Sequence, residues 1–221
     1  MYKVRLSFYK KGYAKFVSHL DLMRMFQRIF KIAGVDIAFS QGFNPHPKMS
    51  IAYPLPVGTT SDEEYLDIQL NSAPNFETLV PQINSAMPRD IRIMRAWEPK
   101  EAMNLLCFSK YTVRIALIEN VDNPQRLIDK FLSRDTIVIA KKSKKGISDV
   151  DIKPLIREIK IEECNGTEII LNMVLSTGEK ANLKASSVLD AFVKYIPEFK
   201  LLHWDINRDS LLKENMMKID V

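Results

Sequence analysis

Residues 4–39, VRLSFYKKGYAKFVSHLDLMRMFQRIFKIAGVDIAF, contain the patterns of a strand, a helix and a second strand in that order. Val4, Leu6 and Phe8 alternate with polar residues, which predicts a strand with one buried face. A helix is predicted after Lys10-Lys11-Gly12, because apolar residues then recur at spacings of three and four. These apolar residues are Leu22, Met25, Phe26, Ile29 and Phe30.

The two ends of this helix carry their own signals. Ser18 followed by Asp21 resembles a capping box with Asp in place of Glu, so the helix is expected to begin after Ser18. Gly34 is expected to end it. A short strand is then predicted over Val35–Phe39, and a proline-rich loop follows it.

The remaining periodic segments extend this order of elements through both halves of the chain. In the first half we predict strands over Met49–Tyr53, Glu64–Leu70 and Asp90–Trp97 and a helix over Asn75–Met87. In the second half we predict strands over Tyr111–Ile118, Thr136–Lys141, Leu155–Glu163, Glu168–Leu175 and Phe199–Asn207, helices over Asn123–Leu132 and Ala185–Tyr195, and a basic loop over Lys142–Gly146. The pair Asn165-Gly166 is a strong hairpin signal.

These elements predict an α+β protein with two ferredoxin-like β-α-β-β-α-β units and antiparallel sheets. We place an N-terminal domain at residues 1–100, with the SHLD and GFNPHP segments, and a C-terminal domain at residues 105–212. Residues 213–221 form a tail with little turn or strand signal, which is expected to fray.

Positive charge is concentrated at the N-terminal end of the sequence. Residues 1–50 contain nine Lys/Arg and two Asp/Glu, whereas the formal charge of all 221 residues is only +5. A basic region of this kind suits a polyanionic partner such as RNA, although many basic proteins of this size bind no nucleic acid.

Several other classes of protein are disfavoured by composition. The chain has no run of 18 apolar residues and begins with a strand pattern, so we expect a cytoplasmic protein with no membrane partner. Cys107 and Cys164 lie far apart, and no CxxC spacing exists, so we expect no disulfide, no metal and no cofactor. No nucleotide-binding glycine loop and no hydrolase motif is present.

The loop Gly42-Phe43-Asn44-Pro45-His46-Pro47-Lys48 is the first candidate site. Two prolines and a glycine make it stiff and unable to continue a helix or a central strand. Asn44, His46 and Lys48 are polar groups that such a loop would hold in place, and Phe43 offers a stacking face. The alternative is that Phe43 is buried and the loop only packs against the sheet.

The start of the helix after Ser18 is the second candidate site. Its free backbone N–H groups favour anions, and Arg24 and Arg28 share one helical face. We predict one continuous ligand-binding pocket that takes an anion such as phosphate; its residues are Ser18, His19, Arg24, Arg28, Gly42, Phe43, Asn44, His46 and Lys48. The alternative is an ordinary capped end with a solvated face.

Two further segments are expected to be structural or solvated. Lys11–Val17 nearly spells an RNA-recognition signature, but it has an inserted lysine and lies in the first strand–helix connection rather than on a third strand. Asp62-Glu63-Glu64, beside Ser61, is expected to be a solvated turn.

Three segments, FVSHLDLMRMFQR (16–28), SQGFNPHPKMSIAYPLPVG (40–58) and SDEEYLDIQL (61–70), resemble the bacterial radical-SAM-linked domain family, whose function is not established. Ser18, His19, Asp21, Arg24 and Gly42–Pro47 carry the resemblance. It implies a stand-alone accessory domain with a radical SAM partner encoded separately. The chain lacks the cysteine triad of the radical enzyme itself.

Three hypotheses remain open at this point. The first is a non-catalytic module that recognises RNA or another phosphate-containing ligand and is linked to a radical SAM protein. The second is an RNA- or nucleotide-processing enzyme with His19, Asp21 and His46 as catalytic candidates, which requires His19 and His46 to converge. The third is a protein-interaction domain that docks a radical SAM enzyme.

Overall fold

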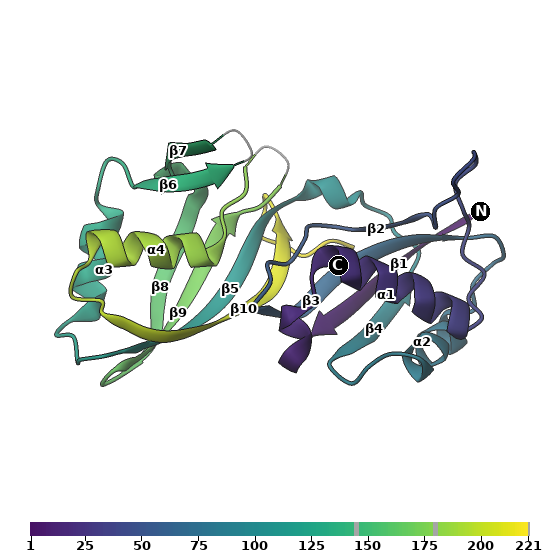
Figure 1. The fold of residues 1–221 in the computed structure, drawn as a ribbon, viewed down its shortest axis with the longest axis horizontal. Coiled ribbons are helices and arrows are strands. Elements are labelled where there is room, and N and C mark those ends of the chain that lie inside the picture. Colours follow the sequence, from purple (N-terminus) through teal and green to yellow (C-terminus); the bar gives the residue numbers. More distant parts are fainter. Residues whose placement is uncertain (144–145, 179–180, 221) are drawn as a thin grey trace. The chain divides into compact units, whose positions relative to one another are not determined.

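The computed structural model describes residues 1–143, 146–178 and 181–220, without the side chains of residues 142 and 143. The chain divides into two compact units (Figure 1). Unit 1 comprises Met1–Leu106 and Met217–Val221, and unit 2 comprises Cys107–Met216. The last residues of the chain therefore belong with the first.

Unit 1 is built on an antiparallel sheet with the strand order β4-β1-β3 and β2 paired to β3. The strands are β1 (Tyr2–Lys10), β2 (Met49–Ile51), β3 (Thr59–Leu70) and β4 (Ile91–Trp97). The short 3-10 helix η1 (Gly12–Phe16) and helix α1 (His19–Ile32) follow β1, and α2 (Phe76–Ser85) precedes β4. A 3-10 turn, η2 (Met103–Leu105), ends the unit's main segment.

The core of unit 1 lies between one face of this sheet and its two helices. Val4, Leu6 and Phe8 are all 0% exposed, as their alternation predicts. The ring of Phe8 meets that of Phe26 on α1 edge-on, with 5.1 Å between centroids. The periodicity that predicts α1 therefore corresponds to the face that packs on the sheet.

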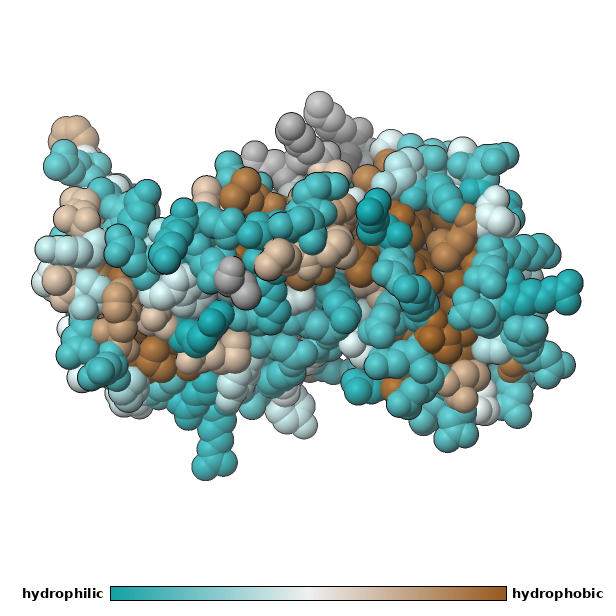
Figure 2. All heavy atoms as spheres, turned by 180° about the vertical axis from the view of Figure 1, so that it is seen from behind, coloured by the Kyte–Doolittle hydropathy of each residue, from teal (hydrophilic) through white to brown (hydrophobic). Residues whose placement is uncertain are grey.

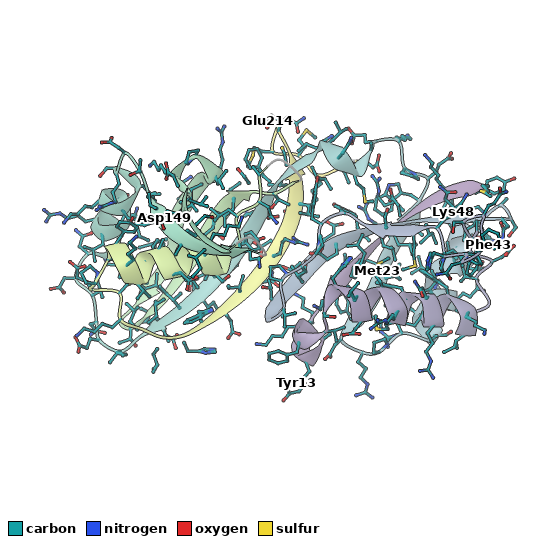
Figure 3. All side chains as sticks on the ribbon, turned by 45° about the horizontal axis from the view of Figure 1, so that its top comes forward. Tyr13, Met23, Phe43, Lys48, Asp149 and Glu214 are labelled. Carbon is teal, nitrogen blue, oxygen red and sulfur yellow. The ribbon has the colours of Figure 1, made fainter. Side chains whose placement is uncertain are left out.

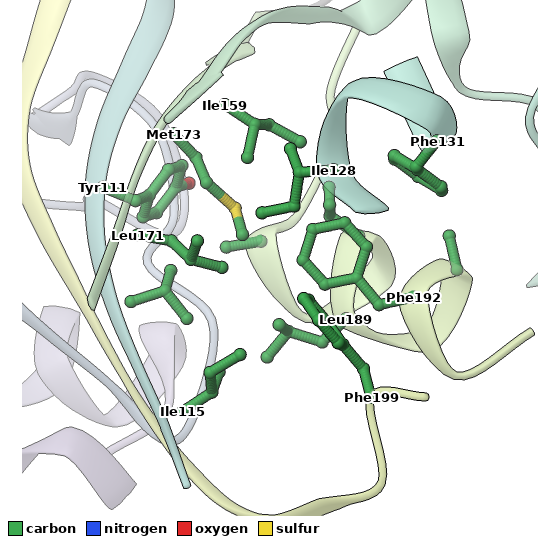
Figure 4. Packing of buried hydrophobic residues seen from close by; sticks show 14 of the residues in the cluster. Tyr111, Ile115, Ile128, Phe131, Ile159, Leu171, Met173, Leu189, Phe192 and Phe199 are labelled. Atoms are coloured by element: carbon green, nitrogen blue, oxygen red, sulfur yellow. The ribbon is translucent and has the colours of Figure 1, made fainter. Parts of the chain in front are cut away.

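Unit 2 repeats this arrangement around a sheet with the order β10-β5-β9-β8. Its strands are β5 (Leu106–Leu117), β8 (Ile156–Asn165), β9 (Glu168–Ser176) and β10 (Leu201–Lys213), and its helices are α3 (Pro124–Leu132) and α4 (Ala185–Tyr195). A 3-10 turn, η3 (Lys153–Leu155), precedes β8. Figure 4 shows the helix residues Ile128 and Phe192 packed among sheet residues such as Leu171.

A separate two-stranded sheet lies between α3 and β8 in the sequence of unit 2. It consists of β6 (Val138–Ser143) and β7 (Gly146–Asp151), which pair antiparallel. The sequence predicts only the first of these strands, and β7 was missed because its side chains are mostly exposed and lack an apolar face. Lys144 and Lys145 of the predicted basic loop lie outside the described residues.

The α+β class with antiparallel pairing is confirmed by the strand pairs and the four α-helices of the described chain. In unit 1, β1 lies between β3 and β4, and in unit 2, β5 lies between β9 and β10. When the β6–β7 pair is left out, the first strand of each unit therefore lies between its third strand and its last. This order is compatible with the ferredoxin-like type. Polar residues cover most of the face drawn in Figure 2, with hydrophobic patches between them.

Three local predictions are wrong. Val35–Phe39 forms two isolated bridges, Ile37 to Leu70 and Phe39 to Pro47, rather than a regular strand. The predicted turn at residues 61–64 lies inside β3, where Ser61 and Glu64 are 0% and 1% exposed and are joined by a hydrogen bond of 2.5 Å. A local pattern does not reveal this burial, because it depends on pairing with β1.

The third wrong prediction concerns the tail, because residues 213–220 are not frayed. β10 continues to Lys213, and the side chain of Ile219 is 0% exposed. Asp220 accepts hydrogen bonds from Arg5 Nη1 at 2.6 Å and from Trp97 Nε1 at 3.0 Å. Polar contacts to the first strand thus hold this end of the chain in place.

Candidate functional site

The first helix presents a row of cations on one exposed face. Ser18 caps α1 by accepting a hydrogen bond from the backbone N–H of Asp21 at 3.2 Å, as the sequence predicts. Arg24, Arg28 and Lys31 follow at spacings of four and three, which places them on one side of the helix. All three side chains are exposed, opposite the buried residues that face the sheet.

The proline-rich loop is closed at its base by two hydrogen bonds between the same two residues. The backbone N–H of Ser40 donates to the carbonyl oxygen of His46 at 2.8 Å, and the N–H of His46 donates to Ser40 Oγ at 2.9 Å. On either side, Ala38 and Lys48 bond to the backbone of Gln69 in β3. The loop therefore projects from a base that is fixed to the sheet.

Helix α1 and the segments flanking this loop enclose a groove of about 700 Å³, which we call the α1 groove. This volume falls in the range of small-ligand sites. Its lining comprises Arg24, Gln27, Arg28, Lys31, Val35, Asp36, Ile37, Phe39, Pro45, His46 and Pro47. Cations from three turns of a helix thus face an imidazole and a half-exposed aromatic ring, that of Phe39.

Some charged side chains of the α1 groove are held in an ion pair and others are not. Arg24 Nη1 lies 3.0 Å from Asp21 Oδ1 in an exposed ion pair. The Ser18 hydroxyl and then Arg24 hydrogen-bond to the Asp21 carboxylate and hold its pKa below its ordinary value. Within the described part of the chain, Arg28 and Lys31 have no ion pair, so their charges are available to a ligand.

One carboxylate also lines the α1 groove. Asp36 Oδ1 accepts a hydrogen bond from Asn71 Nδ2 at 2.8 Å, which engages one of its oxygens. The lining therefore carries three permanent cations, one anion and one histidine, so its balance favours an anionic ligand.

The structure brings together some of the predicted site residues and separates others. Arg24, Arg28 and His46 line the α1 groove, whereas Ser18 and His19 do not. Lys48 lines a different hollow of about 320 Å³ with Lys3, Ser50, Asp67 and Gln69. The single continuous pocket of the sequence prediction is therefore divided in this structure.

The tip of the loop lies outside the groove lining. Gly42, Phe43 and Asn44 are absent from that lining, and the side chain of Phe43 is fully exposed at 112%. The alternative in which Phe43 is buried against the sheet is therefore wrong. Gly42 has φ of +120°, a conformation that favours glycine, and it allows the chain to turn at this tip.

Sequence reasoning missed several lining residues. Lys31 continues the spacing of Arg24 and Arg28 by one further turn, so the helical period is sufficient to predict it. Asp36 and Phe39 carried no such signal, because their place in the groove depends on irregular backbone pairing with β3 and the loop.

The concentration of positive charge in residues 1–50 does not form one surface patch. Arg5 and Lys10 are each only 1% exposed, and Arg5 Nε lies 2.7 Å from Asp67 Oδ1. Lys11 pairs with Asp62. The cations that remain are therefore divided between the row on α1 and other places, since Lys3 and Lys48 line a separate hollow.

The arrangement gives little support to a two-histidine catalytic site. The α1 groove contains His46 but neither His19 nor Asp21, and Asp21 is engaged by Ser18 and Arg24. The described residues include no cluster of three or more His, Cys, Asp or Glu that would hold a metal ion. Also within those residues, no helix is long and apolar enough to cross a membrane.

Unit 2 contains a separate cavity of about 570 Å³ between the β6–β7 pair and α4. Its apolar side chains include Val150, Ile152 and Leu183, and its lysines are Lys141, Lys184 and Lys194. None of the predicted site residues lies there.

Comparisons with known proteins place the chain in a family and identify similar folds. The family model described as "Uncharacterized protein conserved in bacteria (DUF2344)" matches residues 3–185. No curated protein matches the sequence. A radical SAM linkage is not shown by the family match.

Chains of two Cbf5-containing complexes are among the solved structures that resemble this chain. A chain of a Cbf5-Nop10-Gar1 complex matches with a TM-score of 0.54 and 10% identity, covering 96% of this chain and 50% of that one. A chain of the archaeal box H/ACA sRNP Nop10-Cbf5 complex matches with a TM-score of 0.47 and 11% identity, covering 94% and 46%. This chain spans about half the length of those chains, and the first likeness concerns the fold alone.

Proposed function

We propose that this chain, which belongs to the family of uncharacterized proteins conserved in bacteria (DUF2344), is a non-catalytic module that binds RNA through the α1 groove. The observation that carries the proposal is the convergence of Arg24, Arg28 and Lys31 with His46 around one groove. The family match concerns residues 3–185 and assigns no activity.

The chemistry of the α1 groove supports a phosphate backbone as ligand. Guanidinium groups form paired hydrogen bonds with phosphate oxygens, and a lysine adds a mobile cation. Phe39, which is 49% exposed, offers an apolar face beside these cations. A small phosphate-containing ligand shares this chemistry, and a competition experiment with inorganic phosphate separates the two sources.

RNA as the partner is also in keeping with the fold. The similar structure with a TM-score above 0.5 belongs to a Cbf5-Nop10-Gar1 complex, and a weaker match is titled as an H/ACA RNP bound to a substrate RNA. A structural similarity at 10% identity does not by itself show that this chain has the same partner. The link to a separately encoded radical SAM protein rests on the sequence resemblance alone and stays a prediction.

The proposal is tested by the affinity of the full chain for fluorescein-labelled total RNA fragments at 100 mM salt, measured by anisotropy. Arg24→Ala together with Arg28→Ala removes two phosphate contacts. Each phosphate contact to a single strand raises the binding constant by a factor of about five at this salt concentration. The loss of two contacts is therefore expected to lower the affinity about 25-fold.

The matched control is Arg126→Ala with Lys130→Ala. It removes from α3 two exposed cations that are four residues apart. It is expected to bind like the unmodified chain, and both variants are expected to keep the melting temperature. Equal losses in the two variants mean that net charge and not the α1 groove drives binding. Competition by inorganic phosphate at low millimolar concentration means that a small anion is the ligand. Either result contradicts the proposal.

A further inference from the structure

We propose that Tyr13 and Phe16 form a stacking platform for the bases of single-stranded RNA whose backbone follows α1. This inference rests on the proposed function and names the class of RNA that it binds. It also gives a role to the 11–17 segment, which the sequence pattern alone assigns to a structural connection. We call the two side chains the aromatic platform.

Both rings of the aromatic platform are exposed far more than large aromatic side chains usually are. Tyr13 is 86% exposed and Phe16 is 61% exposed. They lie three residues apart on η1, and residues at this spacing in a 3-10 helix project on the same side. Neither ring is needed by the core, because Ala14 is the buried residue of this turn.

The backbone below the aromatic platform is held by one aspartate. The N–H of Lys11 donates to the carbonyl oxygen of Asp90 at 2.8 Å, and the N–H of Tyr13 donates to Asp90 Oδ2 at 3.0 Å. Gly12 has φ of +49°, and a Cβ there would meet Asp90 Oδ2 at 2.7 Å. The turn is therefore fixed in place, while its two rings are left in solvent.

Cationic and apolar groups surround the platform. Lys15 Nζ lies over one face of the Phe16 ring, 5.5 Å from its centroid, and this places positive charge against the exposed ring. The N–H of Gly58 donates to the carbonyl oxygen of Lys15 at 2.8 Å, which brings the exposed Val57 turn alongside. Stacking surfaces for unpaired bases combine such rings with nearby cations.

The face of α1 connects the aromatic platform to the α1 groove. Leu20, Arg24, Arg28 and Lys31 recur at spacings of four, four and three, so they form one stripe along the helix. At 1.5 Å per residue the stripe extends about 16 Å, which suits a strand of a few nucleotides. Tyr13 and Phe43 lie at opposite ends of α1 (Figure 3), so the strand would have an exposed ring near each end.

Single-stranded RNA fits these observations better than a protein partner does. A protein-docking surface is depleted of charge at its centre, whereas Lys15 lies beside this platform and Arg24, Arg28 and Lys31 follow on α1, with Asp21 paired to Arg24 between them. Base-paired RNA presents no free base faces to exposed rings, so the platform favours unpaired strands.

The test compares the full chain with a Tyr13→Ala, Phe16→Ala variant. Anisotropy is measured at 100 mM salt with a labelled 12-nucleotide oligouridine and with a 12-base-pair RNA duplex. The variant is expected to lose at least about tenfold in affinity for the oligouridine and to change little for the duplex. The slope of affinity against salt is expected to stay unchanged, because the phosphate contacts remain.

A Tyr13→Phe, Phe16→Tyr variant keeps both rings and is expected to bind like the unmodified chain. If the unmodified chain binds neither RNA, the proposed function itself fails. If it binds RNA but the alanine variant binds the oligouridine equally well, only the platform is wrong. A protein partner that requires the two rings, with unchanged RNA affinity, also overturns the platform.

Discussion

At the scale of single residues, Asp220 determines how the C-terminal residues are held to unit 1. Its side chain is 2% exposed and accepts hydrogen bonds from Arg5, Trp97 and the backbone of Glu101. The N–H of Asp220 in turn donates to Glu101 Oε2 at 2.7 Å. Burial alone would raise the pKa of Asp220, but the Trp97 bond, the backbone bonds and the charge of Arg5 together hold it below its ordinary value.

This lowered pKa predicts how acid affects the end of the chain. The stabilisation from ionised Asp220 is complete above the ordinary carboxyl pKa of 3.8 and is lost as the pH falls through the lower pKa of the folded protein. We expect Asp220→Asn to cost about 2 kcal/mol of unfolding free energy at pH 7 and to flatten the acid end of the stability curve. Urea unfolding between pH 2.5 and pH 7 measures both effects.

The control for Asp220→Asn is Asp209→Asn, which removes a carboxylate of unit 2 that Thr112 Oγ1 contacts at 2.9 Å. A variant at Asp220 that loses no stability at pH 7, or that keeps the full acid dependence, contradicts this account of the tail.

At the scale of elements, α1 is the clearest case of structure that follows from local sequence. Its cap and its buried face could both be predicted, as could the cap of α3, where Asn123 accepts from the N–H of Arg126. These signals act between residues close in sequence. The Ser61–Glu64 segment could not be predicted, because its burial depends on register with β1, where Lys10 pairs with Ser61.

The candidate site also has one part that local sequence predicts and one part that it does not. The row formed by Arg24 and Arg28 follows from the helical period. The approach of His46 to that row follows from the two hydrogen bonds with Ser40 that close the loop. No pattern in the sequence predicts those bonds.

Replacement of the cap separates the structural and ligand-binding roles predicted for Ser18. Ser18→Ala is expected to lower the unfolding free energy by about 1 kcal/mol, because the N–H of Asp21 loses its acceptor. RNA affinity is expected to stay within about twofold, since Ser18 does not line the α1 groove. Ser18→Thr keeps the hydroxyl and serves as the control. A tenfold loss of RNA affinity with unchanged stability would instead make Ser18 a ligand contact.

At the scale of the whole molecule, two units of the same element order carry different features. Unit 1 holds the α1 groove with its row of cations, and unit 2 has the added β6–β7 pair and its own cavity. The sequence predicts the repeated order because each helix and most strands have local signals. The return of residues 217–220 to unit 1 is a long-range contact without such a signal.

The most direct test of the central claim is the salt dependence of RNA binding. For a single strand, the logarithm of the binding constant falls with the logarithm of salt concentration by about 0.7 for each phosphate contact. Contacts from Arg24, Arg28 and Lys31 predict a slope of about −2 for the unmodified chain and about −0.7 for the Arg24→Ala, Arg28→Ala variant. A slope near zero, or the same slope in both proteins, would contradict RNA binding through the α1 groove.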